Sequence, residues 1–525
     1  MVVVGASSRV EISLYQPPVK LSQNLELEVW IDGERQKERV FFPLREHGIN
    51  SQHYAPHQRC PLVLVSRDVK GDFQQKAEEV LIPAQSEEKS IGSPKSFVPG
   101  MSSAVVMPCE AVRAELSTST WSTNWLGYTC YDGIILTRAD VEGMSGPVYE
   151  AISRYVECGG SVAVVGGGEV PEAWGEGQAT QGAIGSYEVG FGEYLVVEEG
   201  DLDGWNMAIW SVLKQSWDET AEPWRYIKSR EMANRVFPVV EDMQIPLRGM
   251  FVLILAFALL IGPLNIVFFS KKGRRMRLFW TVPLLSLVTS AGILVYSLLS
   301  EGIHGKSRLE TITILDERSH RASTIGLIGY YSPLTPSGGL RFSYETELTP
   351  QTRDARSWDE EDSRLTVDWT NGQDLTSGWI RARIPTHFMV RKSETRRERL
   401  LVREDGNRVV TVVNGLGGRI TSLFVADSEG RIHTGGDIET GAQAQLRAGP
   451  LRCSSRSESL RQLYGLDWTM ILVRITEAPE AYLSPGTYLA QIDGAVFVEE
   501  GLEGGGERNQ TTVVYGITRG ADDEG

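Results

Sequence analysis

The chain has 525 residues, of which 41 % are hydrophobic and 23 % charged, and its 68 acidic and 52 basic residues give a net charge of −16 at pH 7. This acidic balance excludes a general nucleic-acid binder, which needs a basic face. The length predicts two to four domains. The five cysteines show no CxxC motif or framework spacing, which favours buried thiols and leaves a single disulfide open.

Residues 1–95 are predicted to form an all-β domain, a small β-sandwich. Its strands are the alternating or β-branched runs RVEISLY, LELEVWID, RVFFPL and CPLVLVSRD, separated by Pro, Gly and Asn. The first residues lack the basic region and apolar core of a signal peptide. We therefore expect the native start to lie upstream, with the first strand beginning inside the domain.

A group of metal-ligand residue types lies in the middle of this region. His47, His53, His57 and Cys60 are types that bind zinc. Their spacing matches no standard zinc pattern, and the intervening Tyr54-Ala-Pro56 is typical of a loop. The pattern therefore favours a polar surface loop over a metal site.

Residues 96–240 show an α/β pattern that follows a linker rich in Ser, Pro and Gly at 84–100. Buried-type strands are predicted at 104–108, 131–137 and 161–168, with an amphipathic helix at 146–160 that ends in glycine. Strand, helix and strand at this spacing predict a parallel crossover. A further strand, FGEYLVVEEG, and a helix, GWNMAIWSVLKQSW, follow.

The runs YDGIIL (with Asp132), AISRYVECGGSVAVVGGG and GFGEYLVV resemble the glutamine-amidotransferase-like, flavodoxin-type domain of many uncharacterised bacterial membrane proteins. In active members of that family, a cysteine on a strand-to-helix elbow is the nucleophile and a histidine serves it. The corresponding turn here is Gly166-Gly167-Gly168, and the chain has no histidine between residues 58 and 303. A cysteine–histidine pair within the domain is therefore impossible, and Cys158 is expected to be a packed thiol. The glycines favour a structural turn over an anion site.

Two apolar runs without charged residues, 250–270 and 278–300, are predicted to be transmembrane helices, because each is long enough to cross about 30 Å of hydrocarbon. The loop 271–277 between them carries five cations and no acid. Short basic loops stay in the cytoplasm, so both polar blocks are predicted to lie outside it. The residues that would determine this topology are Lys271, Lys272, Arg274, Arg275 and Arg277.

Residues 305–525 are predicted to be rich in β-sandwich structure, with a helix at 454–466 and many short strands, among them TMILVRI. Trp369 and Trp379 are expected to fill sandwich cores, with a glycan-binding face as the alternative. The run MVRKSETRRERL at 389–400 is expected to be a solvated strand edge protected by charge.

The order of these regions resembles uncharacterised bacterial cell-envelope proteins, which are often encoded beside MoxR-type ATPases and von Willebrand factor A-type membrane proteins. The resemblance implies an architecture and a neighbourhood of partners, not an activity. The fold class is thus predicted as α/β plus all-β with a two-helix membrane hairpin, in a two-pass protein of the inner membrane. We expect no catalytic residue and no cofactor, and the lipid bilayer and an envelope protein as partners.

The predicted function is that of a membrane-anchored, non-catalytic binding or scaffolding protein. An accessory subunit of a transport complex is one alternative, although the apolar runs hold no ionisable residue that would mark a solute path. A metal-dependent envelope hydrolase is the other.

Overall fold

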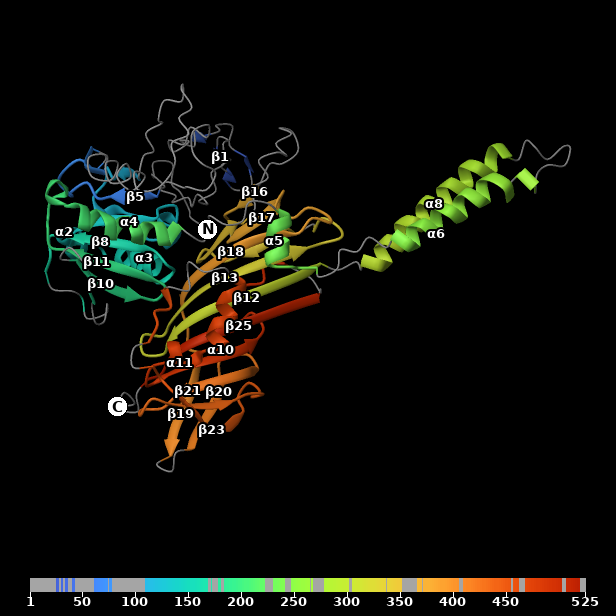
Figure 1. The fold of residues 1–525 in the computed structure, drawn as a ribbon. Helices are drawn as coiled ribbons and strands as arrows, with labels where there is room; N and C mark the ends of the chain where they lie inside the picture. Colours follow the sequence, from blue (N-terminus) through green and yellow to red (C-terminus); the bar gives the residue numbers. More distant parts are fainter. Residues whose placement is uncertain are drawn as a thin grey trace, which may run out of the picture.

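The computed structural model describes residues 61–77, 109–221, 230–301 and 305–519, with internal gaps that include 268–277 and 352–365, and short strands between residues 25 and 42. Figure 1 shows an α/β domain, a long β domain and a helical hairpin that projects away from both. In the N-terminal region the strands form two antiparallel pairs: β1 (Leu25–Leu27) with β4 (Val40–Phe42), and β2 (Trp30–Ile31) with β3 (Glu34–Arg35). These pairs leave the predicted sandwich of residues 1–95 untested.

The α/β domain is built on a seven-stranded sheet of order β6-β5-β7-β8-β11-β10-β9. Its first five strands are parallel and, numbered along the chain, have the doubly wound order 2-1-3-4-5. The last two strands, β10 and β9, are antiparallel. The strands are β5 (Leu62–Val65), β6 (Glu110–Arg113), β7 (Gly133–Thr137), β8 (Ser161–Val165), β9 (Gln178–Thr180), β10 (Ile184–Val189) and β11 (Gly192–Val197).

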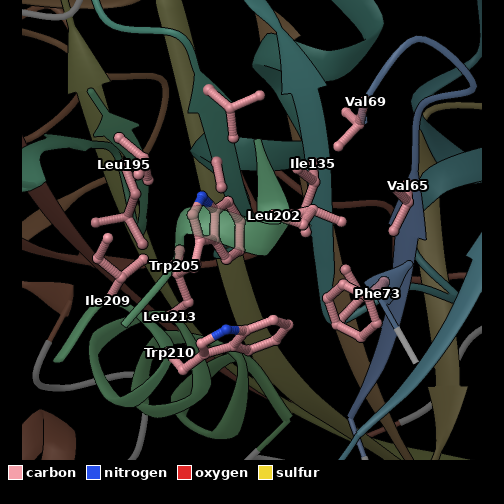
Figure 2. Packing of buried hydrophobic residues seen from close by; sticks show 14 of the residues in the cluster. Val65, Val69, Phe73, Ile135, Leu195, Leu202, Trp205, Ile209, Trp210 and Leu213 are labelled. Carbon is pink, nitrogen blue, oxygen red and sulfur yellow. The ribbon is translucent and has the colours of Figure 1, made fainter. Parts of the chain in front are cut away.

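Helices cover both faces of this sheet. On one face, α3 (Gly146–Glu157) buries Val148, Ile152 and Tyr155 against alternate strand residues, and it ends before Gly159, whose φ is +102°. On the other face, α4 (Met207–Ala221) and the turn before it contribute three tryptophans, Trp205, Trp210 and Trp217, to a buried cluster. Figure 2 shows Trp205 and Trp210 within it. The remaining helical segments are η1 (Thr118–Thr120), η2 (Trp125–Tyr128), α2 (Arg138–Gly143), η4 (Leu202–Gly204) and α5 (Arg230–Val236).

The position of β5 differs from the expected domain boundary. Residues 62–65 were predicted as a strand of the N-terminal sandwich, but they pair in parallel with both β6 and β7. All four are buried, because a central strand of a parallel sheet is covered on both faces. The α/β domain therefore includes residues well before 96. Phe73 belongs to its core, where the centroids of the Phe73 and Trp210 rings lie 5.0 Å apart (Figure 2).

The β domain contains an eleven-stranded sheet of order β15-β18-β13-β12-β25-β24-β21-β22-β23-β20-β19. The early part of β23 pairs with β20, and its later part pairs with β22. The sheet therefore folds over along β23 and encloses a core that contains Leu400, Val412, Val425 and Tyr488. The strands are β12 (Lys306–Asp316), β13 (Arg321–Tyr331), β15 (Thr346–Pro350), β18 (Thr386–Thr395), β19 (Arg399–Asp405), β20 (Val409–Gly415), β21 (Ile420–Ala426), β22 (Arg431–Gly435), β23 (Gln443–Arg452), β24 (Thr487–Asp493) and β25 (Glu507–Ile517).

A small second sheet packs near the start of this domain. It consists of β14 (Leu340–Phe342), β17 (Gln373–Ser377) and β16 (Thr366–Asp368). Its Leu340 and Leu375 share a core with Phe388 of β18. Two helices, α10 (Trp468–Glu477) and α11 (Pro479–Tyr482), lie later in the chain. The predicted strand TMILVRI is thus helical, while the coarse prediction of α/β plus β-rich architecture is confirmed.

The membrane part of the prediction is wrong. The first apolar run forms α6 (Leu247–Leu259), which has 13 residues and passes into a π-helical turn, Leu260–Leu264, that contains Pro263. The second run forms α8 (Leu278–Glu301), which contains Pro283. Within the described ranges, no helix combines the length and apolarity needed to span a membrane. This finding overturns the predicted two-pass inner-membrane localisation.

Candidate functional site

The carboxyl ends of the parallel strands are where doubly wound sheets hold ligands. Here β5, β6, β7, β8 and β11 end at Val65, Arg113, Thr137, Val165 and Val197. The predicted glycine turn follows β8 and therefore lies at this carboxyl edge. The side chains around that turn determine whether this edge can bind a ligand.

The glycine turn is closed by the domain's own groups. Gly166, Gly167 and Gly168 have φ values of +97°, +60° and +115°, which favour glycine at all three positions. The N–H groups of Gly166 and Gly167 both donate to the Val197 carbonyl, at 3.0 and 3.1 Å. A Cβ on Gly168 would lie 1.2 Å from Nη1 of Arg138, and the same Nη1 donates to the Gly167 carbonyl at 3.3 Å. The geometry favours a structural turn, since two of its N–H groups already donate to a carbonyl of the domain.

A buried carboxylate near the same edge is also used internally. Asp140 accepts from the backbone N–H of Thr137 at 2.8 Å and from its hydroxyl at 2.7 Å. Thr137 in turn accepts from the Asp140 N–H, which completes a capping box at the start of α2. Thr118 donates a further bond to Asp140 at 3.3 Å. These bonds leave the carboxylate a helix cap and not a general base with access to a substrate.

The cysteines of the α/β domain are not placed as nucleophiles. Cys158 is buried at the end of α3, at the opposite end of β8 from the glycine turn. Burial raises the pKa of its thiol well above the ordinary value, so the reactive thiolate is suppressed. Cys109 is also fully buried, and none of the four described cysteines forms a disulfide. The acid of the YDGIIL run, Asp132, accepts the Leu62 N–H at 2.8 Å and thereby ties β5 to β7.

The amino edge of the sheet is bonded to the β domain by what we call the arginine joint. Its members are Arg154, Arg321, Arg391, Glu150, Glu157, Glu345 and Glu347. At its centre, Arg391 and Glu347 are 2 % and 1 % exposed and form two hydrogen bonds, one of them 2.8 Å long. Arg391 also donates to the Cys158 carbonyl of the α/β domain at 3.3 Å.

The remaining bonds of the joint cross between the domains. Arg321 of β13 pairs with Glu150 and lies 3.5 Å from Glu157, both on α3. Arg154 of α3 forms an ion pair with Glu345 of the β domain, at 3.0 Å. Burial raises the pKa of Glu157, whereas for Glu150 burial is outweighed by hydrogen bonds from Arg321 and Arg154, which lower its pKa.

Arg461 makes a second contact at the amino edge. It lies 2.7 Å from the buried Glu193 and 3.3 Å from Glu219, and it donates to the Ser216 hydroxyl at 3.1 Å. Phe191, at the turn before β11, also joins the core of the β domain. Polar and apolar contacts together therefore join the two domains.

These residues were missed because the basic run 389–400 was expected to be a solvated edge. Instead, β18 lies between β13 and β15, with Arg391 paired to Glu347 and Lys392 lying 2.9 Å from Glu499. The few apolar residues of this run show no pattern that would indicate burial of both faces of the strand. The acids that pair with these cations, Glu347 and Glu499, lie 44 and 107 residues away in the sequence, so no local signal was available.

The two predicted tryptophan candidates lie in different places. Trp369 stacks on Tyr344, with ring centroids 6.3 Å apart at 17°, and packs against the α/β core. Trp379 packs on Phe388 in the β domain, with ring centroids 6.2 Å apart. Its indole N–H donates to the Thr366 carbonyl at 2.9 Å. The pair therefore does not form one continuous stacking surface.

The buried histidines that the structure describes have structural partners. His387 is buried, and its Nε2–H donates to the Phe237 carbonyl at 2.8 Å; burial lowers its pKa. His433 is buried beside Asp427, at 3.0 Å. His47, His53, His57 and Cys60 lie outside the described residues, as do Lys271, Lys272, Arg274, Arg275 and Arg277. Within the described part of the chain, no three His, Cys, Asp or Glu residues are grouped to hold a metal ion.

Comparison with known protein families found no family that matches the sequence, and comparison with curated proteins found no match. Among solved structures, the fold is matched to the yeast delta-COP-I μ-homology domain complexed with a Dsl1 WxWxV peptide. That match is 6 % identical and covers 40 % of this chain and 95 % of that domain, with a TM-score of 0.17. A score this low carries no argument about fold or function.

Proposed function

We propose that the chain is a non-catalytic binding or scaffolding protein whose α/β domain is a degenerate, flavodoxin-type, glutamine-amidotransferase-like domain. The observation that carries this proposal is the position of Cys158. Its thiol is fully buried, and its carbonyl is bonded to Arg391 of the β domain. A nucleophile needs an accessible thiolate and an adjacent base, and this environment supports neither.

The carboxyl edge supports the same proposal. Arg138 occupies the space beside Gly168, and the Asp140 carboxylate caps α2. The arginine joint and Arg461 keep the two domains in one arrangement, which suits a protein that presents a fixed surface to a partner. By the family resemblance, a von Willebrand factor A-type protein is the partner class to test first.

Labelling with 6-diazo-5-oxo-L-norleucine, which alkylates the cysteine nucleophile of glutamine amidotransferases, tests the loss of chemistry. We expect no modified cysteine in the folded full-length chain and no ammonia release from glutamine. Urea-unfolded protein treated with iodoacetamide is the control, and all five cysteines should then be labelled. Stoichiometric modification of one cysteine, abolished by Cys158→Ser, would overturn the proposal.

A further inference from the structure

A shallow pocket lies beside the small sheet of the β domain. It is formed by the end of β17, the residues that follow it, and the loop before β14, and its cavity volume is about 80 Å³. This volume is well below that of enclosed small-molecule sites, about 300–1,000 Å³, so the pocket can contact one face of a ligand but cannot enclose it. Trp379 lines it, whereas Trp369 does not.

The walls of the pocket are held in place. The Trp379 ring is fixed by its hydrogen bond to the Thr366 carbonyl and by its contact with Phe388. On the opposite side, Gly339 has a φ of +65°, and a Cβ there would lie 2.1 Å from the Leu375 carbonyl oxygen. The loop thus approaches β17 as closely as only glycine permits. A preformed wall reduces the entropy that a ligand must overcome.

The chemistry of the lining is neutral. No lining residue is ionisable, so the pocket offers no charge to bind a phosphate or a carboxylate. Three residues with side-chain hydroxyls, Thr335, Thr376 and Ser377, line the pocket together with the single aromatic residue, and all three are exposed to solvent. Each hydroxyl can donate one hydrogen bond and accept two.

From this combination we infer that the Trp379 pocket binds one neutral pyranose ring of a carbohydrate. The apolar C–H face of the sugar packs on the indole, and its hydroxyls exchange hydrogen bonds with Thr335, Thr376 and Ser377. The open side leaves room for the rest of a glycan chain. A proline-rich peptide fits less well, because grooves for such peptides are lined by several aromatic residues, and this one has a single tryptophan.

This inference extends the proposed binding role, and its failure would be distinguishable, since cysteine labelling tests the loss of catalysis separately. The experiment is ligand-observed NMR and calorimetry on the full-length chain with cellotriose, chitotriose and maltotriose. A galacturonic acid trimer and a proline-rich peptide are the comparators. We expect at least one neutral trisaccharide to bind, and neither comparator.

Two pairs of variants make the result specific. Trp379→Ala should weaken sugar binding at least tenfold, whereas Trp379→Phe, which keeps an aromatic face, should retain part of it. Trp369→Phe should leave binding unchanged, and Ser377→Ala should weaken it a few-fold. Unchanged thermal melting confirms that each variant is folded. Failure of all three neutral sugars to bind, equal affinity of Trp379→Ala and the wild type, or preferential binding of the peptide would each overturn the inference.

Discussion

The two ends of the parallel sheet in the α/β domain differ in chemistry. At the amino end, arginines of the β domain contact the α/β domain: Arg391 donates to the Cys158 carbonyl, and Arg461 contacts the buried Glu193 of β11. At the carboxyl end, hydrogen bonds within the domain close the glycine turn and cap α2. The difference shows that the domain uses its amino end to hold its neighbour, whereas the glycine turn and the start of α2 at its carboxyl end bond to groups of the domain itself.

Disrupting the contacts at the amino end should cause the largest loss of stability. Arg391→Ala leaves Glu347 buried without its cation, and removal of one partner of a buried pair typically costs about 3–5 kcal/mol. We expect a loss of this size in the free energy of unfolding, measured by urea denaturation of the full-length chain. The exposed pair of Arg419 with Asp437 provides the control, because Arg419→Ala should leave the urea midpoint nearly unchanged.

A double variant tests whether the charge or the packing of Arg391 matters. Replacement of a buried ion pair by apolar residues of similar size is often neutral or stabilising. Arg391→Met combined with Glu347→Leu should therefore recover most of the stability that Arg391→Met alone loses. No recovery would show that the bond from Arg391 to the Cys158 carbonyl is the dominant contact.

Substitutions at the carboxyl end should lower the stability less. Gly168→Ala forces a positive φ on alanine and must also displace Arg138, for a total cost of about 1–3 kcal/mol. Gly166→Ala, at a similar φ but with open space around the added methyl, should cost only the backbone part, about 1–2 kcal/mol. In an Arg138→Ala background the two costs should become equal. A persistent difference between them would contradict the role assigned to Arg138.

The smallest expected effect is a pH dependence of the stability that arises from the arginine joint. The joint contains the four carboxylates and three guanidinium groups named above, so one negative charge is in excess, and burial raises the pKa of Glu157 above its ordinary value of 4.5. A carboxyl group whose folded pKa is raised is destabilising when ionised, and it regains stability as the pH falls through the folded pKa towards 4.5. The stability of the wild type relative to Glu157→Gln should therefore increase as the pH falls through that range, with a slope of at most about 1.4 kcal/mol per pH unit.

Chemical denaturation at several pH values measures this difference. Glu150→Gln is the matched comparison, because Glu150 has a lowered pKa on the same helix. Relative to that variant, the wild type should lose stability as the pH falls. The same slope for both variants would contradict the assignment of opposite roles to the two carboxyls.

Much of the α/β domain could be predicted from local patterns. The amphipathic helix that ends before Gly159 and the buried strands 131–137 and 161–168 agree with the structure, because short-range periodicity determines such elements. The place of β5 could not be predicted in this way. Its partners β6 and β7 lie much later in the chain, and only pairing across that distance assigns residues 62–65 to this sheet.

Two errors in the β domain have a common physical cause. Residues 468–477 contain β-branched residues typical of a strand, yet they form α10 because one side, with Ile475, packs on the sheet while Val473 is exposed. Arg391 and Lys392 resembled an exposed edge, yet acids that are distant in the sequence allow them to be buried. In both cases tertiary contacts override the local preference, and the same applies to a site such as the Trp379 pocket, which two distant segments build.

The contact between Arg308 and Pro238 has a consequence for how the chain is put together. The Arg308 guanidinium donates to the Pro238 carbonyl at 2.9 Å, and Arg308 lies at the beginning of β12. The chain therefore leaves the body of the protein and returns to it at the same point. In topological terms, everything between Pro238 and Lys306 is an insertion whose two ends meet, so a short turn can replace it without altering the strand order on either side.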